Sequence, residues 1–283
     1  MVQVLLDLGA KSESGGSATH SPHSAFHCIG KSCAPLSRQL IHGAQCRRAL
    51  KETISLLVNR GFNINDADAD GYNPLLVALT DPDCEAYIIE ELLSAGADAT
   101  PITSDYDTNA AVIAARCCIS RRYSVSCLRL VAPRVLDINA LDRFKLSALH
   151  YAVVSGSNEA VRILAGVAGF DANLRTADGR HPMYFAALFD AKDVISTLVE
   201  VGADIDAATA HKTHGDSSGS DEKTSTVTTL MTAAMRRKTA TASLLLKRMR
   251  AGEGLGWHHK RVTNRGNRRL RTLKARWREY SFY

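Results

Sequence analysis

The chain has 283 residues, 45% of them hydrophobic and 6% aromatic, with a formal net charge of +6. This composition supplies a buried core and excludes a wholly disordered chain. Seven scattered cysteines, an odd number, disfavour a secreted disulfide framework. No apolar run reaches about eighteen residues, so we expect neither a transmembrane segment nor a signal peptide. The sequence therefore predicts an intracellular protein of the cytoplasm or nucleus.

The positive charge is concentrated at the C-terminal end. Residues 257–283 contain nine Lys or Arg and one acidic residue, so the rest of the chain has a net charge of −2. We therefore divide the chain into a body, residues 1–250, and a basic tail, residues 251–283.

A first motif recurs along the body, as in residues 61–65 and 202–206. Four copies follow apolar runs that predict helices, at 54–58, 88–93, 161–164 and 194–199. A glycine after such a run is typical of a helix C-terminus. The third residues of the copies stand 35, 39, 34 and 33 positions apart: Asn63, Asp98, Asp137, Asp171 and Asp204. This regular spacing predicts a repeat protein.

A second motif follows each copy of the first by about twelve residues. Its clearest copies lie at 73–78, 147–152 and 181–186, and weaker ones lie at 24–27, 109–114 and 228–233. Proline in two copies fits the first turn of a helix, where its missing N–H would have no partner in any case. Each period is thus expected to contain two helices.

Together the two motifs resemble the ankyrin repeat, in which a turn precedes a T-P-L-H-x-A-A helix and an apolar second helix ends in G-A-D. The residues that match the family's histidine, proline and turn glycine are His150, Pro74, Pro182, Gly71 and Gly179. The resemblance implies an all-α, ankyrin-type solenoid of six to seven stacked helix-turn-helix repeats over residues 1–250, with short turn or hairpin tips. One helix pair cannot bury its apolar face alone, so successive repeats must stack.

Several segments depart from the repeat pattern. We expect insertions near 30–46 and 211–226, and residues 213–223 are polar enough to predict a mobile loop. The repeat around 104–136 matches poorly, and Pro133 is expected to end its second helix early. The chain opens in mid-repeat, which favours either a truncated longer protein or a degenerate first repeat.

Two clusters have the residue types of metal sites. The N-terminal segment holds His20, His23, His27, Cys28 and Cys33, but without the paired spacing of zinc ligands. Residues 66–71 carry alternate carboxylates like a calcium loop, yet no glutamate stands at the twelfth position. We expect no metal ion and no cofactor.

Catalytic chemistry also lacks support in the sequence. His150 has no nucleophile and orienting carboxylate placed near it by the motif, and the resemblance gives this histidine a structural role. Cys117, Cys118 and Cys127 lie on predicted helices and are expected to be buried apolar residues. We expect no catalytic residue, no small-molecule substrate and no enzymatic activity.

The resemblance implies that partners bind the concave side, at the repeat tips and the exposed side of the first helices. The tips are residues 66–72, 103–107, 141–145 and 176–180. Because exposed aromatic and arginine side chains dominate interface energies, the predicted partner-binding residues are Tyr72, Tyr106, Arg143, Phe144 and Arg180. An alternative for Tyr72 and Phe144 is packing against the next turn.

The basic tail contains an apolar stripe at spacings of three, four and three: Leu270, Leu273, Trp277 and Tyr280. Its other face would carry Arg268, Arg269, Arg271, Lys274, Arg276 and Arg278. Such a basic amphipathic helix fits an anionic membrane, a calmodulin-like groove or a nucleic acid. The alternative is a solvated extension with no partner.

The function expected of the whole chain is that of a protein–protein interaction scaffold or adaptor. One alternative is a regulatory or substrate-recruiting part of a larger enzyme. Another is nucleic-acid or membrane binding through the tail. Fold alone does not separate these classes.

Overall fold

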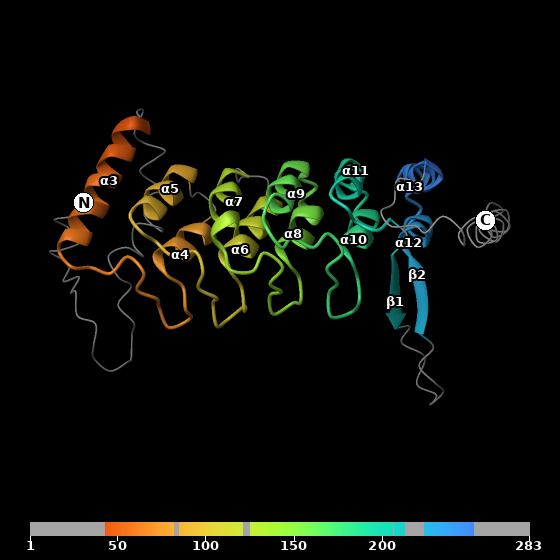
Figure 1. Cartoon of the computed structure of the whole chain (residues 1–283), viewed down its shortest axis with the longest axis horizontal. Helices are drawn as coiled ribbons and strands as arrows, with labels where there is room; N and C mark the ends of the chain where they lie inside the picture. Colours follow the sequence, from red (N-terminus) through yellow and green to blue (C-terminus); the bar gives the residue numbers. More distant parts are fainter. Residues whose placement is uncertain (1–42, 82–84, 121–124, 206, 213–223, 252–283) are drawn as a thin grey trace.

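The computed structural model describes residues 43–81, 85–120, 125–205, 207–212 and 224–251. Within them the helices lie side by side in chain order along one axis, in two rows (Figure 1). The first-row helices are α4 (Pro74–Thr80), α6 (Ala110–Cys117), α8 (Ala148–Ser155), α10 (Pro182–Leu188) and α12 (Thr229–Met235). The second-row helices are α3 (Gly43–Asn59), α5 (Ala86–Ser94), α7 (Ser126–Val131), α9 (Asn158–Ala165), α11 (Lys192–Glu200) and α13 (Thr239–Ala251).

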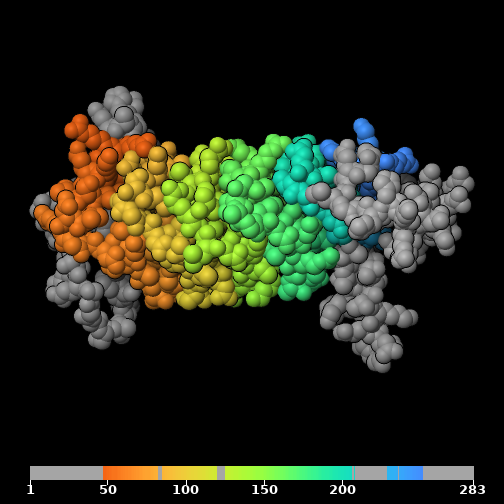
Figure 2. Space-filling model, in the orientation of Figure 1, coloured from red at the N-terminus to blue at the C-terminus, as the bar shows by residue number. Residues whose placement is uncertain are grey.

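Stacking joins each repeat only to its neighbours. First-row helices contact the next first-row helix, second-row helices contact the next second-row helix, and the two helices of one repeat contact each other. The space-filling view accordingly shows the chain's colours as consecutive bands (Figure 2). This arrangement confirms the predicted all-α solenoid, in which burial comes from neighbouring repeats rather than from contacts distant in sequence.

Each first-row helix begins at a polar N-cap that the second motif supplies. Asn73 accepts a hydrogen bond from Leu76 N at 2.9 Å, and Asn109 accepts one from Val112 N at 3.0 Å. The same capping position is held by Ser147, His181 and Thr228 in the later repeats. A side-chain acceptor here satisfies backbone N–H groups that the first turn leaves unpaired. The motif therefore fixes where each helix starts.

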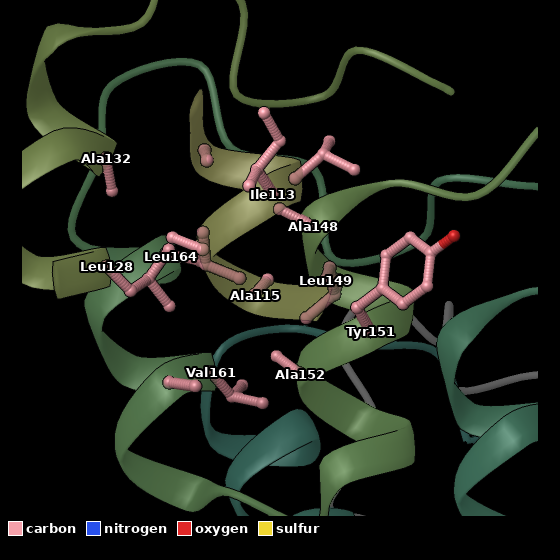
Figure 3. Packing of buried hydrophobic residues seen from close by; sticks show 14 of the residues in the cluster. Ile113, Ala115, Leu128, Ala132, Ala148, Leu149, Tyr151, Ala152, Val161 and Leu164 are labelled. Carbon is pink, nitrogen blue, oxygen red and sulfur yellow. The ribbon is translucent and has the colours of Figure 1, made fainter. Parts of the chain in front are cut away.

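The core lies between the two rows. Figure 3 shows side chains of α7 and α9 facing those of α6 and α8 across it. Leu128 and Leu164 are almost fully buried there. Ala115, Ala148 and Ala152 are fully buried in the first row, where small side chains permit close helix approach.

Two segments differ from regular repeats. Strands β1 (Ala208–Lys212) and β2 (Thr224–Thr228) pair antiparallel, with Ala208 opposite Thr228. The ends of the segment expected to be an irregular insertion are thus extended and paired. Pairing satisfies their backbone groups, and β2 is rich in β-branched residues. In the repeat around 104–136, α7 has six residues and gives way at Ala132 to a 3-10 turn containing Pro133, as the proline predicted.

An asparagine joins consecutive repeats at three places. Asn173 donates through Nδ2 to the Gly202 carbonyl at 3.2 Å and accepts from Asp204 N at 2.7 Å. Asn65 and Asn139 make the same pair of bonds to the repeats that follow them. These bonds fix the register between the first-motif turns of neighbouring repeats.

Replacing Asn173 by alanine is expected to lower the free energy of unfolding by about 1–2 kcal/mol, since two inter-repeat hydrogen bonds are lost at a partly solvated site. Urea unfolding followed by far-UV circular dichroism measures the change. Asn59→Ala, at the exposed end of α3, serves as the control and should leave stability unchanged. Equal losses in both variants would contradict the bridging role.

Candidate protein-binding surface

The four tips are short turns, and in each of them a polar side chain accepts backbone hydrogen bonds. In tip 141–145, the carboxylate Oδ1 of Asp142 accepts from Phe144 N and Leu146 N, each at 2.9 Å. Asp68 accepts from Asp70 N and Tyr72 N in the first tip, and Thr176 accepts from Arg180 N in the fourth. The tips are therefore preorganised, which reduces the entropy that a bound partner would have to remove.

A left-handed residue closes each tip. The turn glycines Gly71 and Gly179, which the family pattern predicts, have φ of 83° and 73°. Asp107 and Lys145 adopt the same conformation in the other tips, with φ of 50° and 59°. Gly71 also approaches the next tip closely, because an added Cβ would lie 3.4 Å from the Ile102 carbonyl.

Backbone hydrogen bonds join the first three tips. Ser104 N donates to the Asp70 carbonyl at 2.9 Å, and Arg143 N donates to the Tyr106 carbonyl at 2.8 Å. Side chains that are distant in sequence, such as Tyr106 and Phe144, are thereby held on one surface.

Three predicted binding residues gather on this surface together with one that the sequence did not indicate. The Tyr106 and Phe144 rings lie 6.2 Å apart between centroids. Arg143 places its guanidinium carbon 5.2 Å from the Tyr106 centroid and 5.6 Å from that of Phe144. Arg116, at the C-terminal end of α6, lies 5.4 Å from the Tyr106 centroid. We call Tyr106, Arg116, Arg143 and Phe144 the aromatic–arginine cluster.

The cluster combines exposure with rigidity. Phe144 is 58% exposed. Arg143 is held by a 3.0 Å hydrogen bond from Nη1 to the Asp105 carbonyl. Cation–π contacts restrain both arginines on the Tyr106 ring, so little side-chain entropy remains to be lost on binding.

The other two predicted residues lie differently. Tyr72 is half-buried against the core, and its hydroxyl donates to Asp105 Oδ2 at 3.2 Å. Burial, together with the Asp105 charge, raises the Tyr72 pKa. Arg180 lies over the ring of Tyr184 in its own repeat, at 5.6 Å, with Asp178 at 3.8 Å. Tyr72 thus packs between the first two tips. Arg180 contacts residues of its own repeat and lies outside the group formed by Tyr106, Arg116, Arg143 and Phe144.

A buried hydrogen bond supports the third tip from below. The Tyr151 hydroxyl on α8 donates to Asp142 Oδ2 at 2.6 Å, and Asp142 is fully buried. Burial and this carboxylate raise the Tyr151 pKa far above its ordinary value. Asp142 therefore binds three donors, two from the tip and one from the helix.

The histidines of this region are structural. His150 is fully buried, its Nδ1 lies 2.8 Å from the Ser147 hydroxyl, and burial lowers its pKa to about 4. His181 accepts from Tyr184 N, while its Nε2 lies 2.8 Å from the Ala207 carbonyl. Burial lowers the pKa of His181 as well. Neither imidazole is exposed to a substrate, although His150 Nε2 makes no hydrogen bond among the described residues.

Two of the three helical cysteines are buried as the sequence predicted, and the third, Cys117, is not fully buried. Cys118 and Cys127 are buried, and burial raises the pKa of each thiol to about 11. Cys117 is half-buried and donates to the Leu79 carbonyl at 3.2 Å. Held protonated, the two buried thiols are unreactive.

Several expectations concern residues that the structure does not describe. The five N-terminal His and Cys residues and the basic tail, with Trp277 and its arginines, lie outside the described ranges. In the part of the chain that is described, no three His, Cys, Asp or Glu side chains come together as a metal site would require. None of the described helices is both long and apolar enough to cross a membrane.

Stacked helix pairs with preorganised, exposed tips define a solenoid repeat protein. Residues 112–209 match the family model for ankyrin repeats in three copies. Over 80 residues, the chain is 34% identical to protein phosphatase 1 regulatory subunit 27 of Mus musculus. That match covers 28% of this chain and 51% of the relative, so it spans about half of the relative's length.

Solved structures agree on the fold. The ankyrin repeat domain of Bcl-3, a member of the IkappaB family, matches at a TM-score of 0.58 with 21% identity, over 81% of this chain and 87% of that one. The human ASB11 ankyrin repeat domain matches at 0.54 with 18% identity, over 84% and 86%. An ankyrin repeat domain from Acinetobacter baumannii matches at 0.52 with 21% identity, over 71% and 95%. At these identities the likeness concerns the fold alone.

Proposed function

We propose that this chain is a non-enzymatic adaptor that binds a protein partner on the concave surface formed by the tips and the first-row helices. Ankyrin repeats generally mediate protein–protein interaction. The observation that carries the proposal is the aromatic–arginine cluster, in which exposed Phe144 and two arginines surround Tyr106. Aromatic and arginine side chains of this kind form the centres of protein interfaces.

The absence of catalysis is part of the same proposal. His150 and His181 are buried, and the pKa of His150 lies at about 4, too low for a general base near neutral pH. The described cysteines with raised thiol pKa values are buried. These groups support a binding role rather than a chemical one.

Changing Phe144 to alanine is expected to reduce retention of the chain's main protein partner by at least roughly fivefold, the scale of a residue at an interface centre. The measurement is capture of partners from nuclease-treated lysate of the source cell, with the retained band quantified. Tyr106→Ala should have a similar effect.

Leu56→Ala is the matched control for these two variants. Leu56 is also a large apolar residue, 48% exposed, but it lies on the second-row helix α3. It should leave retention unchanged. If Leu56→Ala reduces retention of the partner while both cluster variants retain it normally, the partner binds the side of the second-row helices.

A regulatory subunit of a separate enzyme is a second candidate. It rests on the 34% identity with protein phosphatase 1 regulatory subunit 27 over 80 residues. If this chain regulates the same class of enzyme, it binds the protein phosphatase 1 catalytic subunit directly in size-exclusion chromatography. Separate elution of the two proteins at micromolar concentration would leave only the general adaptor role.

A further inference from the structure

Two guanidinium groups share one aromatic ring in the aromatic–arginine cluster. The guanidinium carbons of Arg116 and Arg143 both lie within 5.4 Å of the Tyr106 centroid, so they are at most twice that distance apart. The charge of Arg116 also reaches the hydroxyls of Tyr72 and Tyr151, where it opposes the upward effect of burial on their pKa. Two positive charges therefore lie around the same tyrosine ring.

Neither guanidinium forms an ion pair with a carboxylate among the described residues. Arg143 hydrogen-bonds to the backbone carbonyl of Asp105, while that residue's Oδ2 accepts from Tyr72. Asp142 is fully buried and accepts from three other donors. In contrast, Arg129 and Arg162 on the second row pair with Glu159 and Glu200. Both arginines of the cluster are therefore available to a carboxylate of a partner.

Charge changes sign along the tips. The first two tips carry exposed acids, namely Asp66, Asp70 and Asp107. The third tip carries exposed Arg143 and Lys145, and its own acid, Asp142, is buried. A charge pattern of this kind favours partners with the opposite charge pattern and orients them on the surface. A uniform polyanion laid along the row would meet the acidic tips, whereas a peptide with a local acidic group would not.

We propose that the aromatic–arginine cluster binds an acidic peptide segment of the partner. An Asp or Glu carboxylate would lie between Arg116 and Arg143, where a planar guanidinium presents paired donors to it. An apolar side chain next to that carboxylate would pack on Phe144. The inference rests on the proposed function, since it specifies the chemistry of the partner at the same surface.

The test begins with a random peptide library displayed on phage and selected against the full chain. Enriched peptides are expected to contain Asp or Glu next to an apolar residue. The consensus peptide is then synthesised and its affinity measured by fluorescence anisotropy. Neutral or basic consensus sequences, or no enrichment over support without protein, would overturn the proposal.

Charge contacts are tested from both sides. Changing Arg116 and Arg143 together to glutamine should lower the affinity for the acidic peptide at least roughly tenfold, the effect of losing a hydrogen bond between charged groups. Changing the peptide's acidic residues to their amides should weaken binding to the same extent. When both partners are changed, the loss of binding free energy should be smaller than the sum of the two separate losses. Arg162→Gln, on the second row, should have no effect. An acidic peptide insensitive to the arginines would contradict the inference.

Two further measurements separate the outcomes. The first is the affinity of a mixed-sequence single-stranded DNA oligonucleotide. If the oligonucleotide binds through Arg116 and Arg143 more tightly than the peptide does, the ligand of the cluster is a nucleic acid and the proposal is wrong. If selected peptides depend on Phe144 but not on their acids, the adaptor role stands and the acidic specificity fails. If they depend on neither Phe144 nor the arginines, both proposals fail.

Discussion

Acidification from about pH 7 to about pH 5 should lower the free energy of unfolding by about 2 kcal/mol through His150 alone. In the folded chain burial keeps this imidazole neutral down to a pKa of about 4, whereas its ordinary value is 6.5. Below about pH 6.5 the unfolded chain therefore binds more protons than the folded chain, so a falling pH lowers the free energy of unfolding. The loss grows as the pH falls and levels off below about pH 4. His181, with a lowered pKa, acts in the same direction.

The array itself supplies replacements that do not titrate. His181 caps α10 and reaches the Ala207 carbonyl, as Asn73 caps α4 and donates to the Asp98 carbonyl at 2.7 Å. His181→Asn should keep both contacts. At the position of His150, the repeats before and after have apolar or aromatic residues, Val112 and Tyr184. His150→Leu therefore has a precedent in the neighbouring repeats.

Urea unfolding of the wild type and the double variant, each at about pH 7 and pH 5, isolates the histidine contribution, because the carboxylates titrate equally in both proteins. The variant should lose at least about 2 kcal/mol less than the wild type between these pH values. Equal losses in the two proteins would show that the buried histidines are not the cause.

Most of the fold could be predicted because each repeat carries local signals. The apolar runs at 88–93, 161–164 and 194–199 lie within α5, α9 and α11, and the motif glycines do close turns at positive φ. The exception is the first half of α3. Its residues 43–53 are mostly polar, and Arg47 contacts Glu90 and Glu91 of α5 at 2.9 and 2.8 Å. Such tertiary contacts have no periodic signature in the sequence.

Part of the candidate site could be read from the alignment of repeats. Tyr106, Arg143 and Phe144 were predicted because they fall in the tips, and backbone bonds between tips bring them together. Arg116 was missed because it lies at the end of a helix rather than in a tip. The available signal was its place in the alignment, where the other first-row helices have Thr80, Val154, Leu188 and Met235. A charged residue at a repeat position that is otherwise uncharged indicates a contact that the packing within the repeat does not require.

The sequence also gave no sign of the role of Asp142. Its position resembles other tip acids, but here the carboxylate is fully buried under Tyr151. Burial of this kind depends on how α8 packs beneath the tip, which no local pattern encodes. The structure makes Asp142 the link between the core and the exposed side chains of the third tip.

Asp142→Ala is therefore expected to lower the free energy of unfolding by at least about 3 kcal/mol, because it leaves two tip N–H groups and one buried hydroxyl without an acceptor. The donors are Phe144 N, Leu146 N and the Tyr151 hydroxyl. The tip would also lose the bonds that hold Lys145 at positive φ and orient the cluster. Urea unfolding measures the stability, and anisotropy with the selected peptide measures binding.

Two milder variants separate the contributions to this effect. Tyr151→Phe removes one of the three donors and should cost about 1 kcal/mol, with peptide binding retained. Asp142→Thr keeps an acceptor for the tip, as Thr176 does for Arg180 N in the fourth repeat, and should fall between the other two. This ordering follows from the number of donors left unpaired. If Asp142→Ala costs no more than Tyr151→Phe, the buried carboxylate does not organise the tip, and Arg143 and Phe144 are held by their ring contacts with Tyr106 instead.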